Sequence, residues 1–170
     1  MKFIIRHMKW LWAVFLILGV VACSENTDVA NTANSSEQLL GRVTLDVYKS
    51  RTCGCCEQWI EHVETSGFEA IVHHPVNLNK LKADKRISLR YQSCHTAVSN
   101  DGYVFEGHIP ARIIQQFLAD TPQNAIGLAV PGMPAGSPGM EMGNRHDDYD
   151  VLLLKQGGNA EIYRHITSKL

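Results

Sequence analysis

The sequence lacks a surplus of charge of either sign. Its 16 Lys and Arg residues nearly balance 17 Asp and Glu residues, so the net charge is −1 and the pI is near 6.7. The basic residues are scattered rather than gathered into a stripe with interleaved aromatic residues. Proteins that bind nucleic acid neutralise phosphates with clustered Lys and Arg. We therefore expect no nucleic-acid partner.

The N-terminus also lacks an apolar run long enough to span a bilayer comfortably. The run from Trp10 to Ala22 is shorter than the ~20 residues that a transmembrane helix needs. It follows three basic residues and stops at Cys23, which is the order of a secretory signal peptide. We expect residues 1–22 to be that signal, and a retained transmembrane helix is the weaker alternative.

The end of the apolar run resembles a bacterial lipobox. In Val20-Val21-Ala22-Cys23 the small and aliphatic residues suit the lipoprotein peptidase, and the cysteine thiol would take the diacylglycerol. A free structural cysteine is the alternative. We expect Cys23 to anchor the protein in the cell envelope, facing the periplasm, and Ser24 in place of Asp favours the outer membrane.

The segment after the anchor is polar. Ser24 to Gln38 contains mainly Ser, Asn, Thr, Ala, Glu and Asp, and such a segment cannot offset its ordering entropy by burial. We expect residues 23–40 to be the lipidated cysteine and a flexible tether. The length that remains, residues 41–170, suits one domain with a single core.

Hydrophobic periodicity predicts the order β-α-β-α-β-β-α for this domain. The strands are expected at 43–49, 68–73, 95–99 and 103–106, and the helices at 55–66, at 77–91 as one or two short pieces, and from Pro110 onward. The first two strands should pair in parallel through a right-handed crossover. Asp101-Gly102 predicts a hairpin between the last two. This order is the thioredoxin-like arrangement, so we predict an α/β, thioredoxin-like fold.

The C-terminal part departs from a minimal thioredoxin. A short apolar stretch at 126–130 precedes a Met/Gly/Pro-rich loop at 131–143, in which Pro-Gly-Met occurs twice. Two further runs, 149–154 and 160–166, flank Gly157-Gly158 and predict an extra C-terminal β-hairpin.

Three cysteines crowd into Cys53-Gly54-Cys55-Cys56. Cys53 and Cys56 have Cys-x-x-Cys spacing at a predicted helix start, where unpaired N–H groups and the helix dipole favour thiolates. A dithiol oxidoreductase needs only two sulfurs, whereas three soft donors favour cuprous copper, zinc or iron–sulfur chemistry. The alternative is a disulfide between two of the three cysteines, with the third buried.

Cys94 precedes the third predicted strand, in the loop that faces the Cys-x-x-Cys helix start of a thioredoxin-like arrangement. Thioredoxins hold a cis-proline there, whereas this chain has Ser93-Cys94-His95-Thr96. We therefore predict that Cys94 is a fourth sulfur ligand. The alternative is a small buried hydrophobic residue.

Histidines and methionines are auxiliary candidates. Imidazole binds copper or zinc, which makes His95 and His108 candidates, although each alone can equally be a hydrogen-bonded or capping residue. Thioethers bind cuprous ions, which makes Met133 and Met140 candidates, with Met142 beside them. The alternative for the methionines is an apolar lid. We expect no ligand role for five other histidines: His62, His73, His74, His146 and His165.

Several ordered motifs resemble the CopG-type family, long labelled only as a domain of unknown function. They are Thr52-Cys53-Gly54-Cys55-Cys56, Ser93-Cys94-His95-Thr96-Ala97, the run from Gly102 to Ala111, and the run from Gly127 to Glu141. The resemblance covers residues 43–166. It implies a periplasmic, thioredoxin-like protein of copper resistance that binds copper through the cysteine cluster, with redox activity left open. Residues 77–91 are more polar and basic than the family leads us to expect.

The sequence thus favours a copper-handling protein that binds Cu(I). Its sulfur ligands would be Cys53, Cys55, Cys56 and Cys94, with His95, His108 and a loop methionine as auxiliary donors. Its partners would be metal ions, the membrane through the anchor, and a copper efflux or chaperone protein. Two alternatives stay open: a thiol-disulfide oxidoreductase that uses Cys53 and Cys56 as its catalytic pair, and a zinc-binding structural site.

Overall fold

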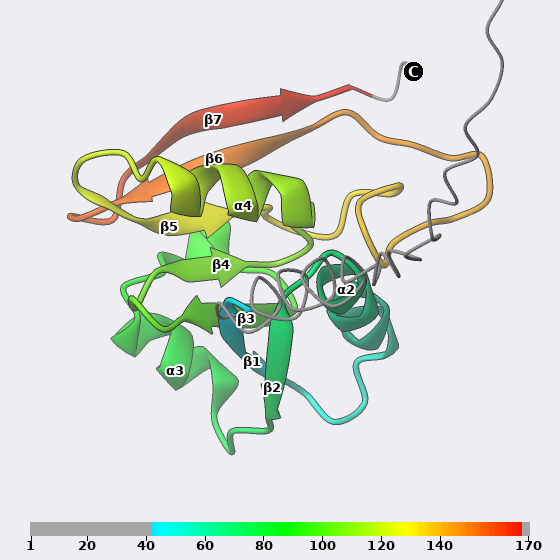
Figure 1. Ribbon diagram of the computed structural model, residues 1–170, viewed down its shortest axis with the longest axis horizontal. Helices are drawn as coiled ribbons and strands as arrows, with labels where there is room; N and C mark the ends of the chain where they lie inside the picture. Colours follow the sequence, from blue (N-terminus) through cyan, green and yellow to red (C-terminus); the bar gives the residue numbers. More distant parts are fainter. Residues whose placement is uncertain (1–41, 168–170) are drawn as a thin grey trace, which may run out of the picture. The chain divides into compact units, whose positions relative to one another are not determined.

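The computed structural model describes residues 42–167, and every structural statement below concerns these residues. The predicted signal peptide (1–22), the lipidation site Cys23 and the tether (23–40) lie outside them. Within the described part, the chain forms one mixed sheet of seven strands with three α-helices (Figure 1). The predicted α/β class is confirmed.

The elements from β1 to α4, residues 44–119, follow the predicted order. The strands are β1 (Thr44–Lys49), β2 (Glu69–His73), β3 (His95–Ser99), β4 (Val104–Glu106), β5 (Ala125–Ala129), β6 (Tyr149–Lys155) and β7 (Ala160–Ile166). The helices are α2 (Gly54–Thr65), α3 (Leu78–Asp84) and α4 (Ala111–Ala119), with the 3-10 turn η1 (Leu89–Tyr91). The predicted helical segment 77–91 therefore divides into α3 and η1. Pro110 stands just before α4, at the N-cap position, rather than in its first turn.

The sheet has the order β2-β1-β3-β4-β5-β6-β7. Strand β1 pairs in parallel with β2, as predicted, and antiparallel with β3, where Lys49 lies opposite His95. The end of β1 therefore lies beside the start of β3. This pairing brings the cysteines that follow β1 and the cysteine that precedes β3 to the same end of these two neighbouring strands.

Strand β5 is missing from the sequence-based prediction, which treats residues 126–130 only as a short apolar stretch. It pairs in parallel with β4 and antiparallel with β6. Gly127 allows the close approach, because a Cβ there would lie 1.7 Å from the Val104 carbonyl oxygen. The predicted C-terminal hairpin, β6 and β7, is therefore joined to the same sheet through β5.

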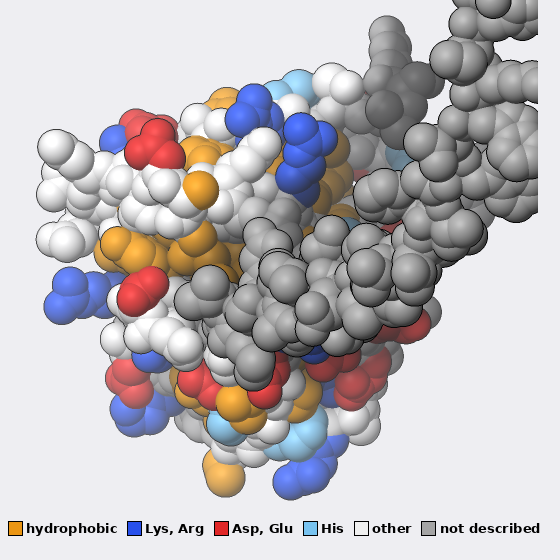
Figure 2. All heavy atoms as spheres, viewed as in Figure 1, with side chains coloured by type: hydrophobic (Ala, Val, Ile, Leu, Met, Phe, Trp, Pro, Cys, Tyr) orange, Lys and Arg blue, Asp and Glu red, His pale blue; other side chains and the backbone are white. Residues whose placement is uncertain are grey.

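The main hydrophobic core lies between one face of the sheet and the helices α2 and α4. Helix residues in it include Trp59, Ile60, Val63, Ile113, Ile114 and Phe117. A smaller cluster on the other face joins Ile87 to Val98 and Val104, because successive strand residues point to opposite faces. Figure 2 shows charged side chains of both signs mixed over one face of the molecule. Among residues 42–167, no helix is long and apolar enough to cross a membrane.

Candidate metal centre

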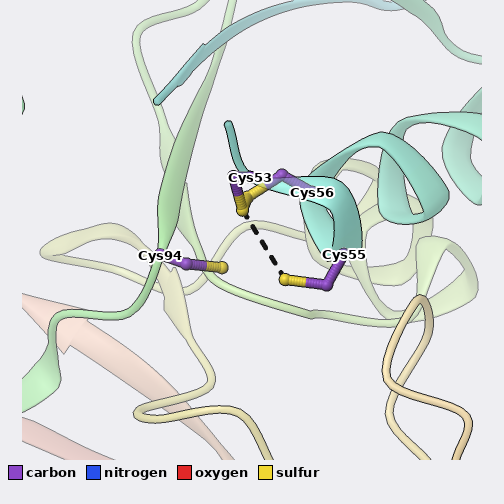
Figure 3. A group of neighbouring side chains, drawn as sticks. All are labelled: Cys53, Cys55, Cys56 and Cys94. Carbon is purple, nitrogen blue, oxygen red and sulfur yellow. Dashed lines mark hydrogen bonds between the residues drawn. A yellow bond between two sulfur atoms is a disulfide. The ribbon is translucent and has the colours of Figure 1, made fainter. Parts of the chain in front are cut away.

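Three cysteines lie at the start of α2, directly after the turn that ends β1 (Figure 3). Cys53 is the N-cap residue, and its N–H donates to the Ser50 carbonyl oxygen at 3.3 Å. Cys55 and Cys56 follow in the first turn, where backbone N–H groups lack partners within the helix. This end of a helix favours negative charge and therefore thiolates.

Cys53 and Cys56 are joined by a disulfide, with their Cα atoms 5.4 Å apart. Cys55 and Cys94 are free thiols, and both are half-buried. The structure therefore shows the paired state that the sequence left open as an alternative, with Cys55 as the third cysteine. The Cys55 sulfur lies 3.5 Å from the Cys53 sulfur, so the free thiol stays in contact with the disulfide.

Cys94 completes the group from the segment just before β3. The sulfur atoms of Cys53, Cys55, Cys56 and Cys94 all lie within 4.8 Å of one another. The four sulfurs singled out in the sequence are thus brought together, although their role as ligands stays a prediction. Burial raises the pKa of Cys94 to about 12, and the nearby Cys55 thiol contributes less to this rise. Without a metal, Cys94 therefore keeps its proton at neutral pH.

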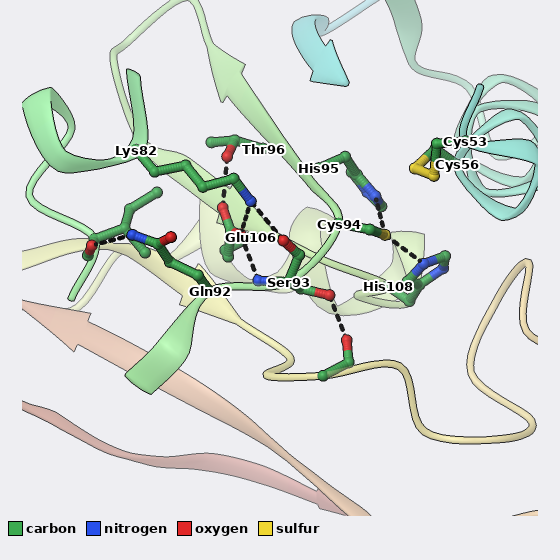
Figure 4. A network of polar contacts seen from close by, with 12 residues as sticks. Cys53, Cys56, Lys82, Gln92, Ser93, Cys94, His95, Thr96, Glu106 and His108 are labelled. Atoms are coloured by element: carbon green, nitrogen blue, oxygen red, sulfur yellow. Dashed lines mark hydrogen bonds and ion pairs between the residues drawn. A yellow bond between two sulfur atoms is a disulfide. The ribbon is translucent and has the colours of Figure 1, made fainter. Parts of the chain in front are cut away.

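His108 lies two residues after β4, beside Cys94 (Figure 4). Its Nδ1 lies 2.7 Å from the Pro138 carbonyl oxygen. Because a carbonyl oxygen can only accept, Nδ1 carries the hydrogen and Nε2 keeps its lone pair. That Nε2 lies 3.0 Å from the Cys94 sulfur. Burial lowers the pKa of His108 despite the opposing effects of the Pro138 carbonyl and Glu141, so the ring is neutral and able to bind a metal.

His95 is the first residue of β3 and is fully buried. Its Nδ1 lies 3.3 Å from the Cys94 sulfur, whereas its Nε2 has no hydrogen-bond partner. Burial holds the pKa of His95 well below its usual range, and the neighbouring His108 contributes less to this effect. The ligand atoms of Cys94, His95 and His108 also lie within 4.8 Å of one another. Two neutral imidazoles thus flank one side of the sulfur cluster.

Trp59 joins this cluster to the rest of α2. Its ring lies 4.4 Å from the His95 ring, centroid to centroid, and its Nε1 donates to the Ile109 carbonyl oxygen at 2.9 Å. The first contact limits the space around the buried imidazole. The second ties the helix that carries three cysteines to the segment that carries His108.

The Gly/Pro-rich loop between β5 and β6 packs against the start of α2. A Cβ on Gly139, where φ is +80°, would lie 2.7 Å from both the Cys55 carbonyl oxygen and the Trp59 amide nitrogen. Only glycine lets the loop backbone come this close to the helix. The preceding residue, Pro138, supplies the carbonyl that orients His108. The loop therefore helps to hold α2 and His108 in place at the site.

The loop methionines differ in their surroundings. Met133 and Met142 are 51% and 58% exposed, and Met140 is half-buried. The apolar-lid alternative therefore stays open for Met133 and Met142, since a lid residue is exposed on its outer face. Their role as metal ligands stays a prediction.

The histidines that we did not expect to be ligands make other contacts. His62 Nε2 accepts the Ala111 N–H at 3.0 Å, at the start of α4, and burial lowers the pKa of His62. His73 Nε2 lies 2.7 Å from Asp46. Among the described residues, the two groups of potential metal ligands contain none of these histidines.

Sequence reasoning missed Trp59, Pro138, Lys82 and Glu106. Lys82 and Glu106 form an ion pair with side chains that are 2% and 0% exposed. Glu106 offered a signal, because it directly follows the strongly apolar Val104 and Phe105 at the end of a predicted strand. Lys82 offered none, because it sits in a polar helix two residues from the exposed Lys80.

Known proteins resemble this chain in both sequence and fold. The family model described as "Protein of unknown function, DUF411" matches residues 91–140. Two solved structures of copper resistance protein CopG, form 2 and form 1, match with 37% and 38% identity and TM-scores of 0.70 and 0.69. The matches cover 75% and 74% of this chain and 100% and 98% of those chains. No curated protein matches.

Proposed function

The chain belongs to the CopG family of copper resistance proteins, and on this basis we propose that it binds cuprous copper at the cysteine and histidine cluster. The observation that carries the proposal is the convergence of four sulfur atoms within 4.8 Å of one another. Soft sulfur donors select Cu(I) over hard ions. The proposed ligands are Cys53, Cys55, Cys56 and Cys94, with His95, His108, Met133 and Met140 as auxiliary donors.

The proposed site depends on the redox state of Cys53 and Cys56. Both sulfurs become available only when a dithiol reductant opens the disulfide: Cys53 and Cys56 gain two electrons and two protons and become thiols, while the reductant's two thiols become a disulfide. Binding of Cu(I) then displaces the thiol protons. The closed disulfide leaves Cys55, Cys94 and the two imidazoles as the remaining donors. We propose that copper affinity and the oxidation state of this pair are linked.

A second candidate function is thiol-disulfide exchange. The disulfide at the start of α2 favours it, and so does the strand arrangement, in which β1 lies between parallel β2 and antiparallel β3. This arrangement supports the thioredoxin-like interpretation of the first part of the domain. Cys94 in place of a proline opposes it, because a further thiol beside the pair invites incorrect pairing. Insulin reduction would separate the two candidates, since a copper-binding protein should show no turnover.

We also propose the location and partners that the sequence favours. Lipidation of Cys23 would hold the domain in the periplasm, on the outer membrane, where a copper efflux or chaperone protein could meet it. The mass of the mature N-terminal peptide tests the anchor directly. An unmodified Cys23, or a retained signal peptide, would contradict it.

Competition titration tests copper binding. The full chain is purified in detergent, reduced, and titrated with Cu(I) against a coloured chelator. We expect binding in the wild-type chain and its loss in the C53S/C55S/C56S variant, while H165N, which alters an exposed histidine on β7, binds normally. A wild-type chain that takes up no Cu(I), or a triple variant that binds equally well, would refute the proposal. The same titration with Zn(II) tests the zinc alternative.

A further inference from the structure

A buried ion pair lies beside the metal centre, between Lys82 on α3 and Glu106 on β4. Lys82 is the buried residue of α3, so this short polar helix turns a charge rather than an apolar side chain toward the sheet. Burying an ion pair is costly, and such pairs often stabilise a protein no better than apolar residues of similar size. The pair therefore calls for a reason other than stability.

Both charges are bonded to the same residue, Ser93 (Figure 4). Lys82 Nζ donates to the Ser93 carbonyl oxygen at 2.7 Å, and Glu106 Oε1 accepts the Ser93 N–H at 2.7 Å. Glu106 Oε2 also accepts the Thr96 hydroxyl at 2.5 Å. The carboxylate thus meets only donors, which is the pattern of its ionised form. Burial raises the pKa of Glu106, while Lys82 and the other donors oppose that effect.

Ser93 directly precedes Cys94, so the residue held by the pair is covalently joined to the one that supplies the fourth sulfur. The Ser93 hydroxyl also donates to the Gly132 carbonyl oxygen, next to Met133. Gly107, next to His108, packs on Ser93 so closely that a Cβ would lie 2.6 Å from the Ser93 Cβ. Three segments that carry proposed ligands therefore meet at Ser93.

We propose that the Lys82–Glu106 ion pair is a positioning device that fixes the backbone before Cys94 and so sets the place of its sulfur in the copper site. Both hydrogen-bonding groups of the Ser93 backbone are held by charged partners, and such bonds are stronger than neutral ones. Groups bonded directly to a metal ligand typically change metal affinity about 10–100-fold, and this pair acts one residue further from the metal. That this positioning serves copper binding rests on the proposed function, whereas the hydrogen bonds at Ser93 do not depend on it.

The rival explanation is purely structural: the pair serves only to hold α3 on the sheet. The double variant K82M/E106Q separates the two, because it removes both charges and leaves no uncompensated charge in the interior. K82M alone removes the donor to Ser93. K80M is the matched control, because it removes a lysine of the same helix that pairs with Asp84 on the exposed surface, with side chains 70% and 61% exposed.

Two readouts on the full chain test the proposal. The first needs no copper: with the disulfide closed, the alkylation rates of Cys94 and Cys55 are compared by peptide mass spectrometry. The second is the Cu(I) affinity of the reduced chain. We expect the double variant to fold, to change the alkylation rate of Cys94 several-fold relative to that of Cys55, and to lose about tenfold in Cu(I) affinity, the lower end of the range for direct partners of metal ligands. K80M should change neither readout.

A folded double variant with the wild-type alkylation ratio and affinity would overturn the proposal. So would a double variant that fails to fold, because the pair would then be a structural element. If K82M alone unfolds, the double variant still decides. If the wild-type chain binds no Cu(I), the proposed function fails, while the alkylation ratio still reports on positioning.

Discussion

The Cys94 sulfur lies 3.0 Å from Nε2 of His108, and the ring is held in that orientation by the Pro138 carbonyl oxygen, 2.7 Å from Nδ1. Because Nε2 can only accept in this state, the Cys94 thiol donates its hydrogen to the imidazole. A metal ion that binds both residues must displace this hydrogen. Metal binding and proton release are therefore coupled at this contact.

The first prediction concerns pH. With its pKa raised to about 12, Cys94 is protonated throughout the neutral range, so binding as a thiolate releases its proton. Cu(I) affinity should therefore rise with pH, by about tenfold per pH unit for each proton released. His95 and His108 add little to this slope near neutral pH, because their lowered pKa values leave the rings neutral. Competition titration at several pH values measures the slope.

The variant C94S is the comparison for this prediction. It should bind Cu(I) more weakly and show a slope that is shallower by about one proton. An unchanged slope in C94S would show that Cys94 does not lose a proton on binding, and would remove it from the ligand set.

The second prediction concerns the loop over α2. The substitution Gly139→Ala should push the loop away, because the added Cβ would lie 2.7 Å from backbone atoms of Cys55 and Trp59. We expect a loss of about 1–3 kcal/mol in unfolding free energy and weaker Cu(I) binding, since the Pro138 carbonyl would leave His108. Gly143→Ala is the control, because Gly143 also has a positive φ of +59° but its Cβ would meet open space. Equal effects of the two substitutions would contradict the packing argument.

These features show what could be predicted from sequence. The strands and helices up to α4 were predictable because their apolar positions repeat with clear periods, as in β1 and α2. The convergence of Cys94 with the other cysteines was predictable because a thioredoxin-like order places the segment before the third strand opposite the start of the first helix. Strand β5 was missed because Ala125–Ala129 is short and contains a glycine, which weakens the strand pattern.

The third prediction concerns acid stability. Burial lowers the pKa of His62, so the folded state resists protonation of this ring more than the unfolded state does. Stability should be fully present above the ordinary histidine pKa and should fall as the pH drops through it. H62A should lose about 1 kcal/mol at neutral pH, because Ala111 at the start of α4 loses its acceptor, and its stability should depend less on pH.

Urea unfolding at several pH values tests this prediction. H165A, which removes an exposed histidine, serves as the control. Parallel pH profiles for H62A and the wild-type chain would show that the contact between His62 and Ala111 does not contribute to acid sensitivity.

The fourth prediction concerns the disulfide. Alkylation of the unreduced, metal-free chain should label Cys55 and Cys94, which are free thiols, and leave Cys53 and Cys56 unlabelled. After reduction all four should react. Peptide mass spectrometry reads each cysteine separately. Labelling of Cys53 or Cys56 before reduction, or a bond that involves Cys55, would contradict the pairing.

The residues that hold the site in place could not be predicted from the sequence, for a physical reason. Lys82 and Glu106 lie 24 positions apart and have no periodic signal, and only the folded chain shows that both are bonded to Ser93. The role of Pro138 depends on its backbone carbonyl, which every residue possesses. Side-chain chemistry is visible in a sequence, whereas contacts made through backbone groups appear only after folding.

Metal content tests the central claim most directly. The full chain is purified without oxygen from copper-stressed cells, and its bound metals are identified and counted beside those of the C53S/C55S/C56S variant. We predict copper in the wild-type chain and its loss in the variant. Zinc in place of copper, no metal at all, or equal copper in both chains would contradict the four-sulfur copper site.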